Sequence, residues 1–237
     1  MEKLGPRLRA IADLVPADCG LLADVGTDHG YLPAALLLAG RIRRAVASDV
    51  GAMPLDRARR TAAELDLEEK MELRLGDGLS VLRPGEADAA VIAGMGGDTI
   101  VSILSAASWC RERGLLLLLQ PMSRAEVLRR WLPENGFALL AEKLVQDKGV
   151  LYPIFTVQGG EITPIDAAAA WGGVLLEDDP LWGLYLEEQI LRLRKAAAGL
   201  VRARDPALAA RRDEFLRVVA ELEIRKGAWE RANRARN

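Results

Sequence analysis

The sequence predicts a doubly wound α/β fold, in which a mostly parallel sheet ends in an antiparallel hairpin and an α-helical hairpin follows. Short apolar runs alternate with amphipathic segments between residues 20 and 160, which is typical of a parallel sheet covered by helices on both faces. After Gly136, two apolar runs surround a QDKG turn. The last third contains two long helical patterns. We therefore expect two domains, residues 1–160 and 161–237.

Five apolar runs are the expected strands of the first domain, and four helix-like segments lie between them. The strands are expected at residues 21–25, 45–50, 71–77, 88–94 and 115–121. The helices are expected at residues 31–40, 53–66, 98–112 and 124–135. Because right-handed crossovers connect parallel strands, the carboxyl ends of these strands meet at one edge of the sheet. A ligand is expected at that edge.

In the second domain, DDP (178–180) and RDP (204–206) each place Asp directly before Pro. Asp is favoured at the N-cap, and Pro at the first helical position, where its missing N–H would be unpaired anyway. Helices are expected at 180–202 and 206–234, after a linker at 161–173. Apolar residues at near-heptad spacing predict a coiled-coil-like antiparallel seam: Leu208, Phe215, Val219, Leu222 and Trp229.

The charge of the chain is small overall and uneven along its length. The formal net charge is −2, so no field of the whole chain favours a polyanionic partner. From Glu187 to the end, however, there are 13 Lys and Arg residues against 8 Asp and Glu residues. A basic segment of this kind binds phosphates in some proteins and is a solvated helix face in many others.

Several classes of protein are disfavoured by composition. Cys19 and Cys110 are far apart and His29 is the single histidine, so we expect no metal site, and no disulfide is supported. The N-terminal MEKLGPRLRA has no apolar core of the kind found in signal peptides. The apolar run Leu115 to Leu119 has five residues, far too few to span a bilayer. We expect a cytoplasmic monomer that does not bind membranes.

The stretch ADVGTDHGYLP, residues 23–33, predicts the ligand. Gly26 and Gly30 allow a tight turn from strand to helix and a close approach of the backbone to a ligand. The G-x-G-x-x-G spacing of dinucleotide-binding turns is missing, and Asp28 would repel a diphosphate. It would not repel S-adenosylmethionine, whose sulfonium is cationic. The alternative is that Asp28 only caps the following helix.

Polar or small residues also follow the other expected strands. Asp49 ends the second strand, where an acid can accept hydrogen bonds from ribose hydroxyls, although a solvated turn would also explain it. GDGL places Asp77 near the expected adenine edge, AGMGG (93–97) leaves an open region after the fourth strand, and QPM (120–122) ends the fifth. The residues expected to bind the cofactor are Asp24, Gly26, Thr27, His29, Gly30, Asp49, Asp77, Gly78, Gly94 and Met95.

These motifs resemble those of the bacterial tRNA (adenine-22-N1)-methyltransferases. RLRAIADLVP, ADVGTDHGYLP, GDGL, IAGMGG and LLQPM occur in that family's order and spacing, and the resemblance extends through essentially the whole chain. It implies a Rossmann-like methyltransferase fold, S-adenosylmethionine as cofactor, tRNA as partner, and a catalytic role for Asp28. No NPPY-like motif follows the fourth strand, and this favours attack by a ring nitrogen over attack by an exocyclic amine.

A tRNA substrate requires groups that bind the target base and the surrounding phosphates. Tyr31 is expected to stack on a base. His29 could stack as well, orient Asp28, or act only as a structural hydrogen-bond donor. The cations expected to bind tRNA phosphates are Arg7, Arg9, Arg192, Arg194, Lys195, Arg202 and Arg204.

Other functions are compatible with parts of the pattern. A methyltransferase acting on another RNA base or on a small molecule is the nearest alternative, although the basic helical hairpin would have no evident use with a small molecule. A nicotinamide-dependent oxidoreductase shares the fold class, but Asp28 and the missing glycine spacing disfavour it. A non-enzymatic RNA-binding or partner-binding protein is disfavoured because Asp24, Gly26, Asp49 and Gly78 are all present.

Overall fold

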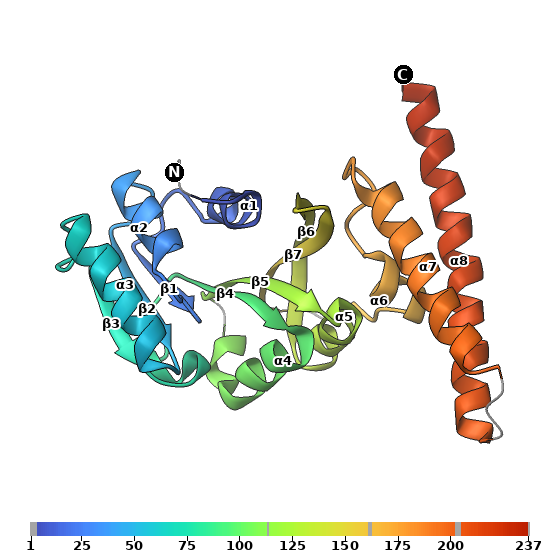
Figure 1. The fold of residues 1–237 in the computed structure, drawn as a ribbon, viewed down its shortest axis with the longest axis horizontal. Coiled ribbons are helices and arrows are strands. Elements are labelled where there is room, and N and C mark those ends of the chain that lie inside the picture. Colours follow the sequence, from blue (N-terminus) through green and yellow to red (C-terminus); the bar gives the residue numbers. More distant parts are fainter. Residues whose placement is uncertain (1–3, 113, 161–162, 202–204, 237) are drawn as a thin grey trace. The chain divides into compact units, whose positions relative to one another are not determined.

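The computed structural model describes residues 4–112, 114–160, 163–201 and 205–236, with the side chains of residues 235 and 236 excepted. The chain separates into two compact units, residues 1–164 and 165–237. Each unit is described by itself below, and Figure 1 labels the elements of both.

The first unit contains one seven-stranded sheet with the order β3-β2-β1-β4-β5-β7-β6 (Figure 1). The first five strands are parallel, β7 is antiparallel to β5, and β6 is antiparallel to β7. Their bounds are β1 Leu21–Val25, β2 Arg44–Asp49, β3 Met71–Leu75, β4 Ala89–Gly96, β5 Leu116–Ser123, β6 Phe137–Asp147 and β7 Val150–Gly159. The predicted fold class is confirmed. Since β1 lies between β2 and β4, the chain changes direction along the sheet beside β1, where folds of this kind bind ligands.

Helix α1 precedes β1, and the other helices of the first unit lie between successive strands. The helices are α1 Pro6–Leu14, α2 Tyr31–Leu38, α3 Ala52–Glu64, α4 Gly97–Ala106 and α5 Ala125–Glu134, with short 3-10 helices η1 Gly78–Val81 and η2 Ser108–Arg111. Two apolar clusters form the core. Leu118 belongs to the cluster that includes residues of α1 and α2, and its neighbours Leu117 and Leu119 belong to the cluster that includes residues of α4 and α5. Both faces of β5 are therefore buried, which explains its uninterrupted run of leucines.

The antiparallel hairpin of β6 and β7 has the two-residue loop Lys148–Gly149. Both loop residues have positive φ, +50° and +81°, and Asp147 pairs with Val150 across the loop. Two successive positive φ angles are typical of the type I′ turn, whose twist matches that of the flanking strands. The QDKG segment therefore forms the predicted turn.

The fourth and fifth strands extend further than predicted. Met95 pairs with Pro121 and Gly96 with Ser123, with register shifts on either side of Met95. Gly94 has a φ of +80°, a conformation that glycine adopts without strain and that is common in β-bulges. The bulge keeps Met95 and Gly96 paired in the sheet, while Ala93 and Gly94 line a pocket at its edge, as expected of an open region.

The second unit consists of α6 Ala167–Gly172, α7 Trp182–Gly199 and α8 Pro206–Arg236. Helix α6 lies inside the expected linker and begins at Asp166, whose Oδ1 accepts a hydrogen bond from the Ala169 amide at 2.6 Å. Asp205 accepts one from the Ala207 amide at 2.8 Å and precedes α8 as predicted. Helix α7 begins two residues later than predicted, because Asp179 accepts from the Leu181 amide at 2.9 Å.

Buried apolar residues join α8 to the other helices of this unit. Val219 and Leu222 are buried, and a side chain at Gly183 in α7 would collide with the ring of Trp229. The Phe215 ring meets the Trp171 ring of α6 edge-on, with centroids 6.3 Å apart. Leu208 is 37% exposed, so its expected place in the seam is wrong. The buried positions of α8 begin later, at Val218.

The part of the chain that the structure describes has neither a membrane-spanning helix nor a cluster of metal-binding side chains. None of its helices has the length and apolar character needed to cross a membrane. The same residues contain no group of three or more His, Cys, Asp or Glu side chains placed to bind a metal ion. Cys19 and Cys110 are buried free thiols, and burial raises the pKa of each to about 11.

Candidate cofactor and catalytic site

The turn between β1 and α2 has an unusual backbone. Gly26, Asp28 and Gly30 have φ angles of +75°, +50° and +68°. Glycine adopts such angles freely, and Asp is among the few other residues that tolerate them. The Gly26 and Thr27 amides donate to the Ser48 carbonyl at 2.8 and 2.9 Å, so the turn is fixed to the end of β2.

Asp24 is the last polar residue of β1 and is only 7% exposed. The Thr27 hydroxyl donates to its Oδ2 at 2.6 Å. Burial raises the pKa of Asp24 to about 6; the hydrogen bond from Thr27 opposes this rise, and the charge of Asp49 adds to it. A buried carboxylate of this kind is stabilised by a cation placed beside it.

Asp28 extends into solvent from the same turn, with 59% of its side chain exposed. Its Oδ1 lies 2.9 Å from Nη2 of Arg57 on α3, and its Oδ2 lies 3.7 Å from Nε2 of His29. The N-cap of α2 is Gly30, and no side chain makes a capping hydrogen bond there. The alternative that Asp28 caps α2 is therefore wrong, and its carboxylate is instead paired with Arg57 at the edge of the sheet.

A pocket of about 250 Å³ lies between this turn, α1 and the end of β4. Eight of the residues singled out in the sequence line it: Arg7, Asp24, Gly26, Thr27, Asp28, His29, Tyr31 and Gly94. Met95 packs directly on Gly26, where any side chain would collide with the Met95 methyl group. The φ of +75° at this position favours glycine more strongly than this contact does, because the end of the flexible Met95 side chain can shift.

Arg7 is fixed inside this pocket by a residue that the sequence reasoning missed. Its Nη1 donates to Oε1 of Gln120 at 2.6 Å, and the same oxygen accepts from the Gly94 amide at 3.1 Å. Gln120 is fully buried and its Nε2 donates to the Pro121 carbonyl at 2.8 Å. The sequence signal for this role was a polar residue, Gln120, at the end of an apolar strand, because a buried amide side chain requires hydrogen-bond partners.

Other predicted cofactor residues lie at the same edge of the sheet but outside this pocket. Asp49 accepts a hydrogen bond from the Gly51 amide at 2.9 Å and lies close enough to influence Asp24. Asp77 and Gly78 line a second pocket of about 420 Å³ together with residues of α4. The structure therefore divides most of the predicted set between two cavities, and Asp49 lines neither of them.

The predicted phosphate-binding cations have different surroundings. Arg9 donates to the Leu4 carbonyl at 3.4 Å and lines a shallow pocket with Lys143. Arg194 pairs with Glu223 on α8. Arg192 and Lys195 are exposed, and neither has an ion pair within the described ranges. Arg202 and Arg204 lie outside the described residues.

The pocket beside the turn has the charges that a zwitterion requires. Two carboxylates, Asp24 and Asp28, and one guanidinium, Arg7, line it. S-adenosylmethionine has a cationic sulfonium, an ammonium group and a carboxylate, so both signs of charge find a partner. A diphosphate would instead lie beside two acids.

Comparison with known proteins agrees with this fit. A family model described as a methyltransferase domain matches residues 4–155. The tRNA (adenine(22)-N(1))-methyltransferase of Bacillus subtilis (strain 168) is 34% identical over 187 residues, which are 79% of this chain and 76% of that protein.

Solved structures resemble the whole chain. The crystal structure of the B. subtilis M1A22 tRNA methyltransferase TrmK superimposes with a TM-score of 0.81 at 27% identity, covering 93% of this chain and 98% of that one. Sp1610 of Streptococcus pneumoniae, solved in complex with S-adenosyl-L-methionine, superimposes with a TM-score of 0.75 at 29% identity, covering 90% of this chain and 98% of that one.

Proposed function

Because the chain belongs to the family of tRNA (adenine(22)-N(1))-methyltransferases, we propose that it transfers a methyl group from S-adenosylmethionine to N1 of adenine 22 in tRNA. The observation that carries this proposal is the exposed Asp28 carboxylate in a glycine-rich turn beside a buried second carboxylate. This arrangement suits a cationic methyl donor and a base that becomes cationic when it is methylated.

S-adenosylmethionine supplies a methyl group that is activated by the positive charge on its sulfur. We assign Asp24 and Asp28 to the cationic part of this cofactor and Arg7 to its carboxylate, because these three charges line one pocket. Gly26 and Gly94 leave the backbone accessible beside them. Asp49, Asp77 and Gly78 are assigned to the adenosine part, on their position at the ends of β2 and β3.

Asp28 is the proposed catalytic residue. Adenine N1 has a lone pair in the plane of the base, so no proton must leave before it attacks the methyl carbon. The Asp28 carboxylate would accept a hydrogen bond from the 6-amino group and stabilise the positive charge that develops on the ring. The Asp28 side chain is 59% exposed at the turn, so an incoming base can reach its carboxylate.

The tRNA partner also requires cations for its phosphates. The proposed set includes Arg9 on α1 and Arg192, Arg194 and Lys195 on α7. Ion pairing of Arg194 with Glu223 reduces what Arg194 can contribute, whereas Lys195 is exposed and has no ion pair among the described residues. We place this activity in the cytoplasm, with its tRNA substrate. The monomeric state stays a prediction.

Methylation of a defined tRNA tests the proposal. The protein is incubated with unmodified tRNA and labelled S-adenosylmethionine, and the modified nucleoside is identified and located by mass spectrometry. We expect 1-methyladenosine at position 22, and none in a matched tRNA with guanine at that position. Methylation elsewhere, or equal methylation of both tRNAs, would contradict the proposal.

A further inference from the structure

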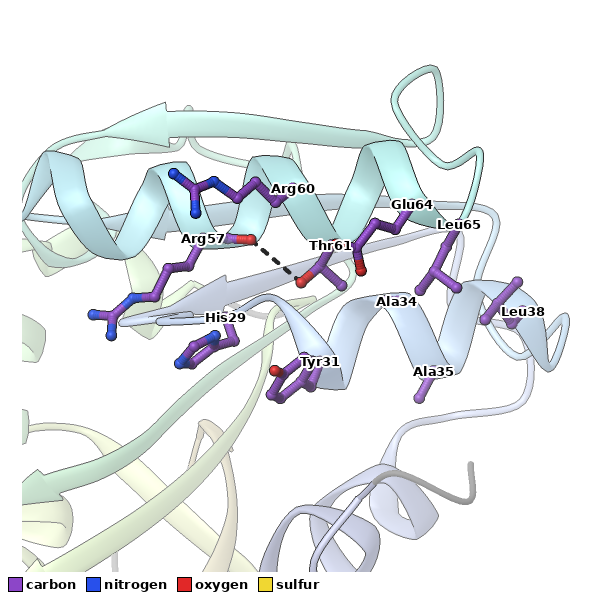
Figure 2. Close-up of a pocket in the computed structure, with 10 residues that line it drawn as sticks. All are labelled: His29, Tyr31, Ala34, Ala35, Leu38, Arg57, Arg60, Thr61, Glu64 and Leu65. Carbon is purple, nitrogen blue, oxygen red and sulfur yellow. Dashed lines mark hydrogen bonds between the residues drawn. The ribbon is translucent and has the colours of Figure 1, made fainter.

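Another cavity, distinct from the pocket beside Asp24 and from the pocket beside Asp77, lies next to the Asp28 turn. It has a volume of about 690 Å³ and runs between α2 and α3, which supply all of its lining except His29 and Leu65 (Figure 2). We call it the α2–α3 groove. His29 and Tyr31 line both this groove and the pocket that contains Asp24. The two cavities therefore share one pair of side chains in their linings.

That pair forms an exposed aromatic stack. The rings of His29 and Tyr31 are nearly parallel, 8° apart, with their centroids separated by 5.0 Å, and Tyr31 is 42% exposed. Figure 2 shows the two rings next to each other at one end of the groove. Nucleic-acid bases stack readily on such exposed rings, whatever their sequence.

Two arginines one turn apart on α3 line the same end of the groove. Arg57 is paired with Asp28 at 2.9 Å. Arg60 is exposed and has no hydrogen bond or ion pair to any described residue. The opposite end is lined by Leu38, Leu65 and Glu64, and an acid there disfavours a phosphate. An anion is therefore favoured only at the end that lies beside the aromatic pair.

The charges around Asp28 also favour a phosphate at this end of the groove. Arg57 lies 2.9 Å from Asp28, and its positive charge would oppose that of a cationic methylated base beside the same carboxylate. A phosphate beside Arg57 would compete for its guanidinium and leave the Asp28 charge available to the base. Substrate binding in the groove would in this way favour the reaction beside it.

We propose that the α2–α3 groove binds the nucleotide next to the target adenine in tRNA. The base of that neighbour stacks on the groove side of the His29–Tyr31 pair, and its phosphate lies on Arg57 and Arg60. The target adenine lies on the opposite side of the pair, beside Asp28. The aromatic pair then separates two bases that are stacked in free RNA and replaces part of the lost stacking. This inference rests on the proposed tRNA methylation and names how the same site recognises its substrate.

A comparison of arginines on one helix tests the phosphate contact. Arg60→Ala is compared with Arg59→Ala, which removes the same charge from α3 but lies outside the groove, where Arg59 pairs with Asp56. We expect Arg60→Ala to raise the KM for tRNA about 10-fold and to lower the salt dependence of binding by about one counterion. Arg59→Ala should stay within about twofold of the parent protein. Equal effects of the two variants would reject the contact.

Synthetic tRNAs that lack one base test the stacking. Tyr31→Ala should lower kcat/KM about 10-fold on intact tRNA, as for the loss of one stacked base. On tRNA that is abasic at the neighbour in the groove, the same substitution should cost about twofold or less, because no stacking is left to lose. On tRNA abasic at the other neighbour of adenine 22, the full loss should persist. The same loss on all three tRNAs would overturn the proposal.

The outcomes separate this inference from the proposed function. Affinity for S-adenosylmethionine, measured by calorimetry, should be the same in the parent, Arg59→Ala and Arg60→Ala proteins, which shows that the fold is intact. If the parent protein methylates adenine 22 and the variants behave alike, only the groove assignment fails. If the parent protein does not methylate adenine 22, the proposed function fails, and the groove assignment fails with it.

Discussion

In the first unit, Arg57 and Arg60 lie on the lining of the groove beside the β1–α2 turn, and among the described residues only Arg57 has an ion-pair partner, Asp28. In the second unit, several cations of α7 and α8 are paired with acids of the same unit. These pairs are Arg194 with Glu223, Lys226 with Glu187, and Arg225 with both Asp166 and Glu221. The second unit, which has the larger surplus of Lys and Arg residues in the sequence, therefore pairs several of its cations with its own acids.

This difference shows that a surplus of charge in the sequence does not locate a phosphate site. Pairs such as Arg194 with Glu223 connect one helix to the other, as charges flanking a coiled-coil seam do. A cation in such a pair must give up its partner before it binds a phosphate. Arg60 lacks a partner within the described residues and lies in a groove, although its own segment has no unusual charge.

The largest effect is expected at the turn of the first unit. Asp28→Ala should lower the single-turnover rate of methyl transfer by roughly 10²–10³, the scale for losing one preorganised electrostatic group. Asp28→Asn should lower it less, because Asn retains an acceptor and tolerates the φ of +50°. Rapid-quench measurements with saturating tRNA would check both. A rate equal to that of the parent protein for Asp28→Ala would remove the catalytic assignment.

Asp24 gives a pH-dependent effect in the same unit. Its pKa in the folded protein is about 6, against an ordinary value of 3.8, so the folded state binds this proton more tightly than the unfolded state. The contribution of Asp24 to stability is therefore most favourable below pH 3.8 and is lost as pH rises to about 6. Asp24→Asn should raise the free energy of unfolding at neutral pH by about 3 kcal/mol.

Urea unfolding at several pH values would measure this effect. The stability difference between Asp24→Asn and the parent protein should disappear near pH 4 and grow towards pH 7. S-adenosylmethionine should bind the parent protein more tightly as pH rises through about 6, since the ionised carboxylate attracts a cation. A stability difference that is independent of pH would contradict the burial of an ionisable group at this position.

Removal of the second unit should affect tRNA and leave the cofactor unaffected. Deleting residues 165–237 should weaken tRNA binding at least about 10-fold at moderate salt, because several phosphate contacts are lost together. The affinity for S-adenosylmethionine should be unchanged, since the cofactor pocket is lined by residues of the first unit. Filter binding and calorimetry would measure the two affinities. Full tRNA affinity in the shortened chain would place all phosphate contacts in the first unit.

The smallest effect compares two cations of α7. Lys195→Ala should weaken tRNA binding about threefold, since an exposed, unpaired ammonium can contact a phosphate. Arg194→Ala should change it less, because Arg194 is paired with Glu223. Measurement of both dissociation constants at one salt concentration decides the comparison. A larger loss for Arg194→Ala would show that ion pairing in the hairpin does not limit its contacts with RNA.

Features that depend on neighbouring residues could be predicted from the sequence. The parallel strands follow from apolar runs, the β6–β7 turn follows from QDKG, and the start of α8 follows from Asp205 before Pro206. The same holds for Asp28, because a carboxylate among turn glycines is visible without any tertiary contact. Propensity, capping and turn geometry act over a few residues, so they are present in the sequence itself.

Features that depend on distant residues could not be predicted in this way. Arg7 and Gln120 are 113 residues apart and meet only because α1 and the end of β5 reach the same pocket. The α2–α3 groove exists because two helices pack side by side. Arg194 forms an ion pair because α8 places Glu223 beside it. The sequence alone determined which elements form and which acid the turn presents to a ligand. Only the tertiary structure decided which charges are paired and which are free, because a side chain's partner depends on how distant elements pack.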